Sequence, residues 1–67
     1  MLDRNLLRHE MKENNCSIDE LANVCGISRS AMYRRLKGQV DFKVNEIIRC
    51  TGRLHLSIDR RNRIFFA

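Results

Sequence analysis

One segment constrains the fold of this chain more than any other, because it carries two helix starts separated by a single glycine. At the first start, S-I-D-E forms a capping box in which the side chains of Ser17 and Glu20 can satisfy free backbone amides. Gly26 can adopt a positive φ without strain and end that helix. Ser28 is a second good N-cap, and no helix breaker follows before Gly38. The pattern predicts two short helices joined by a tight turn.

Apolar residues at helical spacing predict three further helices. The first spans residues 3–14 and begins at the cap Asp3, and another runs from residue 42 or 43 to residue 51 and ends at Gly52. A last helix follows the cap Ser57. The apolar stripe of the helix before Gly52 is expected to consist of Val44, Ile47, Ile48 and Cys50. We therefore expect residues 1–67 to form one all-α domain of four to five helices.

Composition agrees with a small helical domain. The 67 residues are 43% hydrophobic, with three glycines and no proline. No apolar run approaches the ~20 residues that a membrane helix requires, and the start M-L-D-R-N-L-L-R lacks the apolar region of a secretory signal. We expect a cytoplasmic location.

Catalysis and metal binding are not expected. A chain this short buries only roughly 60% of the surface that its unfolded form exposes, so a deep catalytic cavity would leave little core. No serine, cysteine or carboxylate stands at a spacing from His9 or His55 that suggests an activated nucleophile. The cysteines Cys16, Cys25 and Cys50 lack C-x-x-C spacing, and we interpret them as buried reduced thiols. The sequence therefore favours a chain that is not an enzyme and has no cofactor, metal ion or small-molecule ligand.

Charge is distributed unevenly along the chain. Thirteen Lys and Arg against eight Asp and Glu give a net charge of +5. Residues 1–27 hold three basic and five acidic residues, a net of −2, whereas residues 28–67 hold ten basic and three acidic residues, a net of +7. A one-sided basic surface attracts a polyanion, and the phosphate backbone of a nucleic acid is the usual one.

Two short helices with a tight glycine turn and a basic second helix describe a helix-turn-helix, here over about residues 17–38. The motif needs a small residue where the helices cross, and Ala22 supplies it. Gly26 provides the turn and Ile27 fills the corner. Met32 is expected to anchor the second helix to the core.

The stretch L-A-N-V-C-G-I-S-R-S-A-M-Y-R-R-L-K-G resembles the helix-turn-helix of the phage Cro/repressor-like regulators, also called XRE-like. Both D-F-K-V-N-E-I-I-R and R-N-R-I-F-F are similar to small regulators of phages and mobile elements in Gram-positive bacteria. A rival resemblance, confined to I-S-R-S-A-M-Y-R-R-L-K, is to Fis-type activator domains. The first resemblance implies a five-helix, lambda-repressor-like domain that binds double-stranded DNA at an inverted-repeat operator and regulates transcription, most simply as a repressor in a bacterial or phage-infected cell.

The resemblance also implies which residues contact DNA. The base contacts implied are Ser28, Arg29, Ser30, Tyr33 and Arg34. Arginine can donate two hydrogen bonds to O6 and N7 of guanine, so Arg29 and Arg34 are expected to determine specificity. The family often has glutamine where this chain has Ile18, which cannot contact a phosphate. Backbone contacts are expected instead from Ser17, Asn23, Arg35, Lys37, Gln39 and Lys43.

Other interpretations of these residues stay open. The arginines of the second helix can also form an ordinary solvated face, and Tyr33 can pack against the neighbouring loop. Ile64, Phe65 and Phe66 either close the core or form a homodimer contact. The arginines Arg60, Arg61 and Arg63 either form a second phosphate patch or serve solubility. A different class of function, a protein-binding antirepressor or adaptor that retains the fold, is the alternative to DNA binding.

Overall fold

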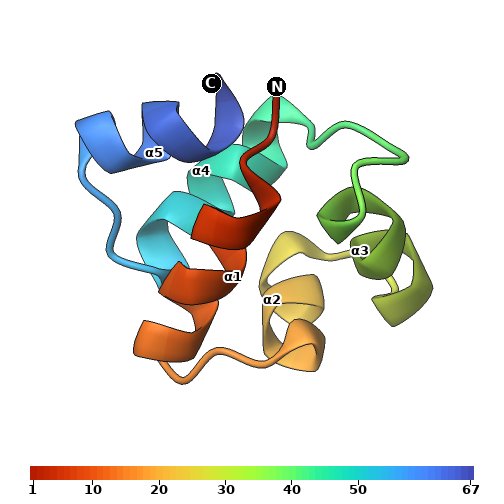
Figure 1. Ribbon diagram of the computed structural model, residues 1–67. Coiled ribbons are helices and arrows are strands. Elements are labelled where there is room, and N and C mark those ends of the chain that lie inside the picture. The colour runs from red at the N-terminus through yellow and green to blue at the C-terminus, as the bar shows by residue number, and fades with distance from the viewer.

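The computed structural model describes all 67 residues and contains five helices and no strand. The helices are α1 (Arg4–Glu13), α2 (Ile18–Cys25), α3 (Arg29–Leu36), α4 (Val44–Arg53) and α5 (Ile58–Phe65). α2 packs against both α3 and α4, and α1 packs against α5 (Figure 1). None of the five helices has the length and apolar character that crossing a bilayer requires. The expected all-α architecture is confirmed.

Short polar side chains begin four of the helices. Asp3, Ser17, Ser28 and Ser57 each accept a hydrogen bond from the backbone amide three residues further on. The predicted capping box is present, because Ser17 Oγ accepts from the Glu20 amide at 3.1 Å and Glu20 Oε1 accepts from the Ser17 amide at 3.4 Å. These bonds satisfy amides that have no partner inside a helix, so the helix starts follow the sequence.

The helix ends follow the sequence less closely. Gly26 ends α2 with a left-handed backbone at φ 69°, as predicted. Gly52 does not end α4, which continues to Arg53, and the left-handed residue of the following turn is His55 at φ 52°. The extra residues allow the Leu54 amide to donate to the Cys50 carbonyl at 2.9 Å and bring the Leu54 side chain, 1% exposed, into the core.

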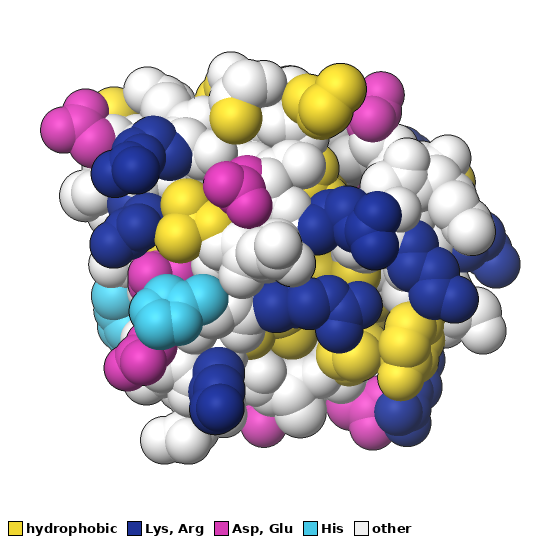
Figure 2. Space-filling model, in the orientation of Figure 1, with side chains coloured by type: hydrophobic (Ala, Val, Ile, Leu, Met, Phe, Trp, Pro, Cys, Tyr) yellow, Lys and Arg dark blue, Asp and Glu magenta, His cyan; other side chains and the backbone are white.

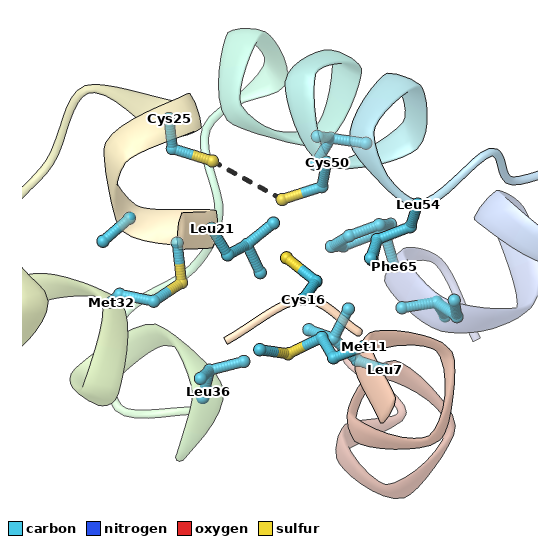
Figure 3. Packing of buried hydrophobic residues seen from close by; sticks show 13 residues of the cluster. Leu7, Met11, Cys16, Leu21, Cys25, Met32, Leu36, Cys50, Leu54 and Phe65 are labelled. Carbon is cyan, nitrogen blue, oxygen red and sulfur yellow. Dashed lines mark hydrogen bonds between the residues drawn. The ribbon is translucent and has the colours of Figure 1, made fainter. Parts of the chain in front are cut away.

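The core is one cluster of buried apolar side chains to which every helix contributes, and Figure 3 shows the labelled ones converging. Its members are Leu7, Met11, Cys16, Leu21, Ala22, Cys25, Met32, Leu36, Ile47, Cys50, Leu54, Ile64 and Phe65. All three cysteines are free and buried, as interpreted from the sequence. The Sγ atoms of Cys25 and Cys50 lie 3.5 Å apart, joining α2 to α4 (Figure 3).

One expectation about apolar residues needs correction, and the burial of two C-terminal residues decides between two open alternatives for them. On α4, Ile47 and Cys50 are buried, whereas Val44 and Ile48 are 75% and 64% exposed. Val44 and Ile48 stand four residues apart and share a face of α4 other than the one that packs on α2. At the C-terminus Ile64 and Phe65 belong to the core, and only Phe66 of that group is exposed. Ile64 and Phe65 therefore cannot serve as an exposed dimer contact.

Candidate nucleic-acid interface

The turn between α2 and α3 holds the two helices in a fixed arrangement. The Gly26 amide donates to the Asn23 carbonyl at 3.1 Å, and the Ile27 amide donates to the Ala22 carbonyl at 3.0 Å. Ala22 on α2 is 3% exposed. Met32 on α3 has no exposed surface and anchors that helix to the core. This is the helix-turn-helix arrangement that the spacing predicted, and it turns one face of α3 to solvent.

The open face of α3 is polar and carries no acidic residue. Met32, Arg35 and Leu36 are the buried residues of the helix, and Tyr33 is half-buried. The exposed side chains of this face, together with the residues just before and after the helix, are Ser28, Arg29, Ser30, Arg34 and Lys37. Three of these five carry a positive charge and two carry a hydroxyl, so the surface is rich in hydrogen-bond donors.

Arg29 at the start of α3 is held by two neighbours. Its Nη1 lies 3.4 Å from Asp19 Oδ2 on α2, and its Nη2 lies 3.5 Å from the Tyr33 hydroxyl. Its guanidinium carbon also lies 5.5 Å from the centre of the Tyr33 ring. The hydrogen bond to Tyr33 and the charge of Asp19 raise the pKa of Arg29, which stays protonated. Since Arg29 and Asp19 are 59% and 65% exposed, their ion pair is weak enough for a ligand to replace.

Arg34 differs from Arg29 because its guanidinium has no partner within the protein. It is exposed and makes no side-chain hydrogen bond or ion pair. Ser30 stands one helical turn before it on the same face. All five donors of the Arg34 guanidinium are therefore available to an external acceptor.

The residues expected to contact a DNA backbone are exposed, with one exception. The exposed ones are Ser17, Asn23, Lys37, Gln39 and Lys43. Ser17 is the N-cap of α2 and Lys43 occupies the N-cap position of α4, where its backbone amide donates to Glu46 Oε1 at 3.0 Å. Asn23 lies in the last turn of α2, and Lys37 and Gln39 follow α3 directly.

Arg35 is the exception, and the expectation that it contacts a phosphate is corrected. It is 8% exposed, because it stands three residues after Met32 on the inner side of α3. Its Nε and Nη2 donate to the two carboxylate oxygens of Glu46 at 2.7 and 3.2 Å, and its Nη1 donates to the Ala31 carbonyl at 3.2 Å. Each of the three guanidinium nitrogens donates a hydrogen bond inside the protein, so Arg35 is left out of the proposed interface.

Glu46 is the buried partner that the sequence reasoning missed. Burial alone would raise the pKa of this carboxyl, but hydrogen bonds from Arg35 and from the Lys43 amide outweigh it, so the pKa of Glu46 is lowered. The only signal in the sequence was that Glu46 is the sole acidic residue of a helix with an apolar stripe. The charged pair locks α3 to α4 behind the open face.

No group of three or more His, Cys, Asp or Glu side chains lies close enough together to hold a metal ion. Comparisons of this chain with protein-family models, with curated proteins and with solved structures found no match. The kind of partner that the open face of α3 can bind is therefore inferred from the side chains on that face. A convex helix face with arginines, a lysine and hydroxyls suits a partner that offers negative charge and many hydrogen-bond acceptors.

Proposed function

We propose that this chain is a sequence-specific DNA-binding regulator of transcription, and that it acts as a repressor by placing α3 in the major groove of its operator. The observation that carries the proposal is the open face of α3, where Arg29 and Arg34 stand five residues apart and the helix has no acidic residue. An arginine pairs bidentately with O6 and N7 of guanine, and each such pair gives about 1–3 kcal/mol of discrimination. Ser28, Ser30 and Tyr33 stand beside them for further contacts to base edges.

Backbone contacts would set the register of α3 in the groove. The exposed side chains that support such contacts are Ser17, Asn23, Lys37, Gln39 and Lys43. Contacts of this kind position a protein on the duplex without reading sequence. Because they displace condensed counterions, they make the affinity fall with salt.

The proposed operator is an inverted repeat with one subunit on each half-site. Recognition helices in successive major grooves then lie about 34 Å apart. Since Ile64 and Phe65 are buried, a homodimer contact through the C-terminal segment depends on Phe66, which is 60% exposed. Such a regulator works in the cytoplasm of a bacterial or phage-infected cell.

A protein-binding antirepressor or adaptor is the second candidate function. The observation that favours it is the pair Val44 and Ile48, which lie one turn apart on α4 and are both largely exposed. Exposed apolar side chains that adjoin one another are typical of protein contacts. The absence of acidic or apolar side chains from the exposed face of α3 favours DNA binding.

The test is a selection of random duplex DNA by the purified protein at physiological salt, followed by titration of the enriched duplex and a shuffled one. The proposal expects an inverted-repeat motif that binds on the order of 10³-fold more tightly than the shuffled duplex. Equal, weak and salt-sensitive binding to every sequence would contradict it. In that case the adaptor function would be favoured, and a Val44→Asp/Ile48→Asp variant would probe the apolar pair.

A further inference from the structure

The three basic residues of α1 form a stripe that the charge totals conceal. Arg4, Arg8 and Lys12 stand four residues apart and therefore line one side of the helix. All three are exposed. None of their side chains donates a hydrogen bond or forms an ion pair within the protein. We call these residues the α1 stripe.

The acidic residues of the same half of the chain are engaged elsewhere. Three of them pair with arginines outside the α1 stripe, a fourth lies near His9, which makes an ion pair only when its imidazole is protonated, and the fifth caps α1. The pairs are Glu10 with Arg60 at 3.6 Å, Glu13 with His9 at 3.8 Å, Asp19 with Arg29 at 3.4 Å and Glu20 with Arg53 at 2.9 Å, and the cap is Asp3. None of these five carboxylates pairs with the α1 stripe, so its three positive charges stay available to an external anion.

The α1 stripe borders the proposed interface at both of its ends. Arg8 and Lys12 line a shallow depression of about 250 Å³ together with Ser17, the N-cap of α2. At the other end, a Cβ atom placed on Gly38 would lie 3.7 Å from Arg4 Cδ, and Lys37 lines the same hollow as Arg4. Figure 2 shows Lys and Arg side chains gathered over the region between α1 and α3.

We propose that the α1 stripe binds the phosphate backbone of the DNA strand that borders the groove occupied by α3. This inference rests on the proposed function and extends its footprint to a third helix. Eight residues of helix separate Arg4 from Lys12, a rise of about 12 Å. One strand of duplex carries a phosphate every 3.4 Å or so of axis, so the stripe has the reach for two or three phosphates.

The stripe also supplies charge where α2 lacks it. Ile18, the first residue of α2, is half-buried against the core and lines the same depression as Arg8 and Lys12. An isoleucine offers a phosphate neither charge nor a hydrogen bond. A backbone phosphate close to Ser17 would therefore find its counter-charge on α1.

The test compares two variants that each lose two positive charges. Arg8→Gln/Lys12→Gln removes part of the α1 stripe, and Arg61→Gln/Arg63→Gln removes two arginines of α5, which Figure 1 places far from α3. Affinity for the selected duplex and for a shuffled duplex is measured over a series of salt concentrations. The expected result is that the stripe variant lowers the slope of log affinity against log salt by about one to two on both duplexes. Its preference for the selected duplex stays unchanged, and the α5 variant keeps the wild-type slope.

The inference is overturned if the stripe variant keeps the wild-type slope, or if the two variants lower it equally. Failure of the proposed function looks different. In that case the wild-type protein shows no preference for any sequence, while the comparison of slopes on the shuffled duplex still decides whether the α1 stripe contacts phosphates.

Discussion

The guanidinium of Arg35 on α3 and the carboxylate of Glu46 on α4 form a two-point ion pair, with N–O distances of 2.7 and 3.2 Å, inside the protein. Their side chains are only 9% and 3% exposed. Removing two charges from water is costly, so such a pair contributes little net stability, whereas an unpaired member destabilises strongly. What the pair contributes is a defined position of α3 relative to α4, and with it the orientation of the open face.

This relationship predicts a strong asymmetry between single and double variants. Arg35→Leu leaves the Glu46 carboxylate buried without its partner and should lower the free energy of unfolding by about 3–5 kcal/mol. Arg35→Leu/Glu46→Leu removes both charges and should recover most of that loss. Urea unfolding of the wild type, Arg35→Leu, Glu46→Leu and the double variant measures the coupling free energy between the two side chains. Losses that simply add in the double variant would show that the two side chains act independently.

The same pair predicts an acid sensitivity. Hydrogen bonds from Arg35 and Lys43 lower the pKa of Glu46 in the folded state below its ordinary value of 4.5, so the unfolded chain binds more protons at acidic pH. The stabilisation is present above pH 4.5 and is lost as the pH falls through the folded-state pKa. The melting temperature of the wild type should therefore fall between about pH 5 and about pH 3 more steeply than that of the Arg35→Leu/Glu46→Leu variant. Residual sensitivity is expected from Glu20, whose pKa the Arg53 hydrogen bond lowers.

Arg34→Ala tests base recognition by α3. Because the Arg34 guanidinium is exposed and has no partner in the protein, its loss should not affect folding. If it pairs with a guanine, the variant loses about 1–3 kcal/mol of discrimination, roughly 5- to 150-fold, at one base pair of each half-site. Titration of single-base operator variants measures this, with Arg63→Ala on α5 as the control. A uniform loss at every position would instead assign Arg34 to the phosphate backbone.

Asp19→Asn tests whether the pair with Arg29 restrains binding. The carboxylate is exposed beside the proposed interface and repels a polyanion, while its ion pair contributes little to stability. The variant should melt as the wild type does and bind operator DNA roughly two- to fivefold more tightly at low salt, with the gain fading as salt screens the charge. Fluorescence anisotropy at two salt concentrations measures it. Weaker binding would mean that Asp19 is needed to orient Arg29.

Local sequence signals predicted most of the helix boundaries, because a cap involves residues only three apart. Ser17, Glu20 and Ser28 form the expected capping bonds, and Gly26 takes the expected left-handed backbone. Arg35 was assigned wrongly because its partner Glu46 is eleven residues away, and a sequence pattern does not say which arginines of a basic helix turn inward. The open face of α3 was predicted correctly because Met32 and Leu36 define its opposite side.

The errors on α4 and the overlooked α1 stripe have a common origin in long-range packing. Val44 and Ile48 are apolar at helical spacing, but α2 covers only the side of α4 that carries Ile47 and Cys50. On α1, summing charges along the chain averaged Arg4, Arg8 and Lys12 with acidic residues that pair elsewhere. In both cases the arrangement of neighbouring helices decides which residues stay exposed, and that arrangement is not a local property.

The glycines provide a prediction in which the same substitution has opposite effects. Gly26 has φ 69°, a left-handed backbone that strains any residue with a Cβ, so Gly26→Ala should lower the free energy of unfolding by about 1–2 kcal/mol. Gly52 lies within α4 and a Cβ there meets nothing within 4 Å, so Gly52→Ala should raise it by about 0.5–1 kcal/mol. Thermal and urea unfolding of the two variants measure both effects. Because the turn at Gly26 sets the angle of α3, Gly26→Ala should also weaken operator binding, whereas Gly52→Ala should leave it intact. Equal stability of the two variants would mean that α2 does not need the left-handed turn.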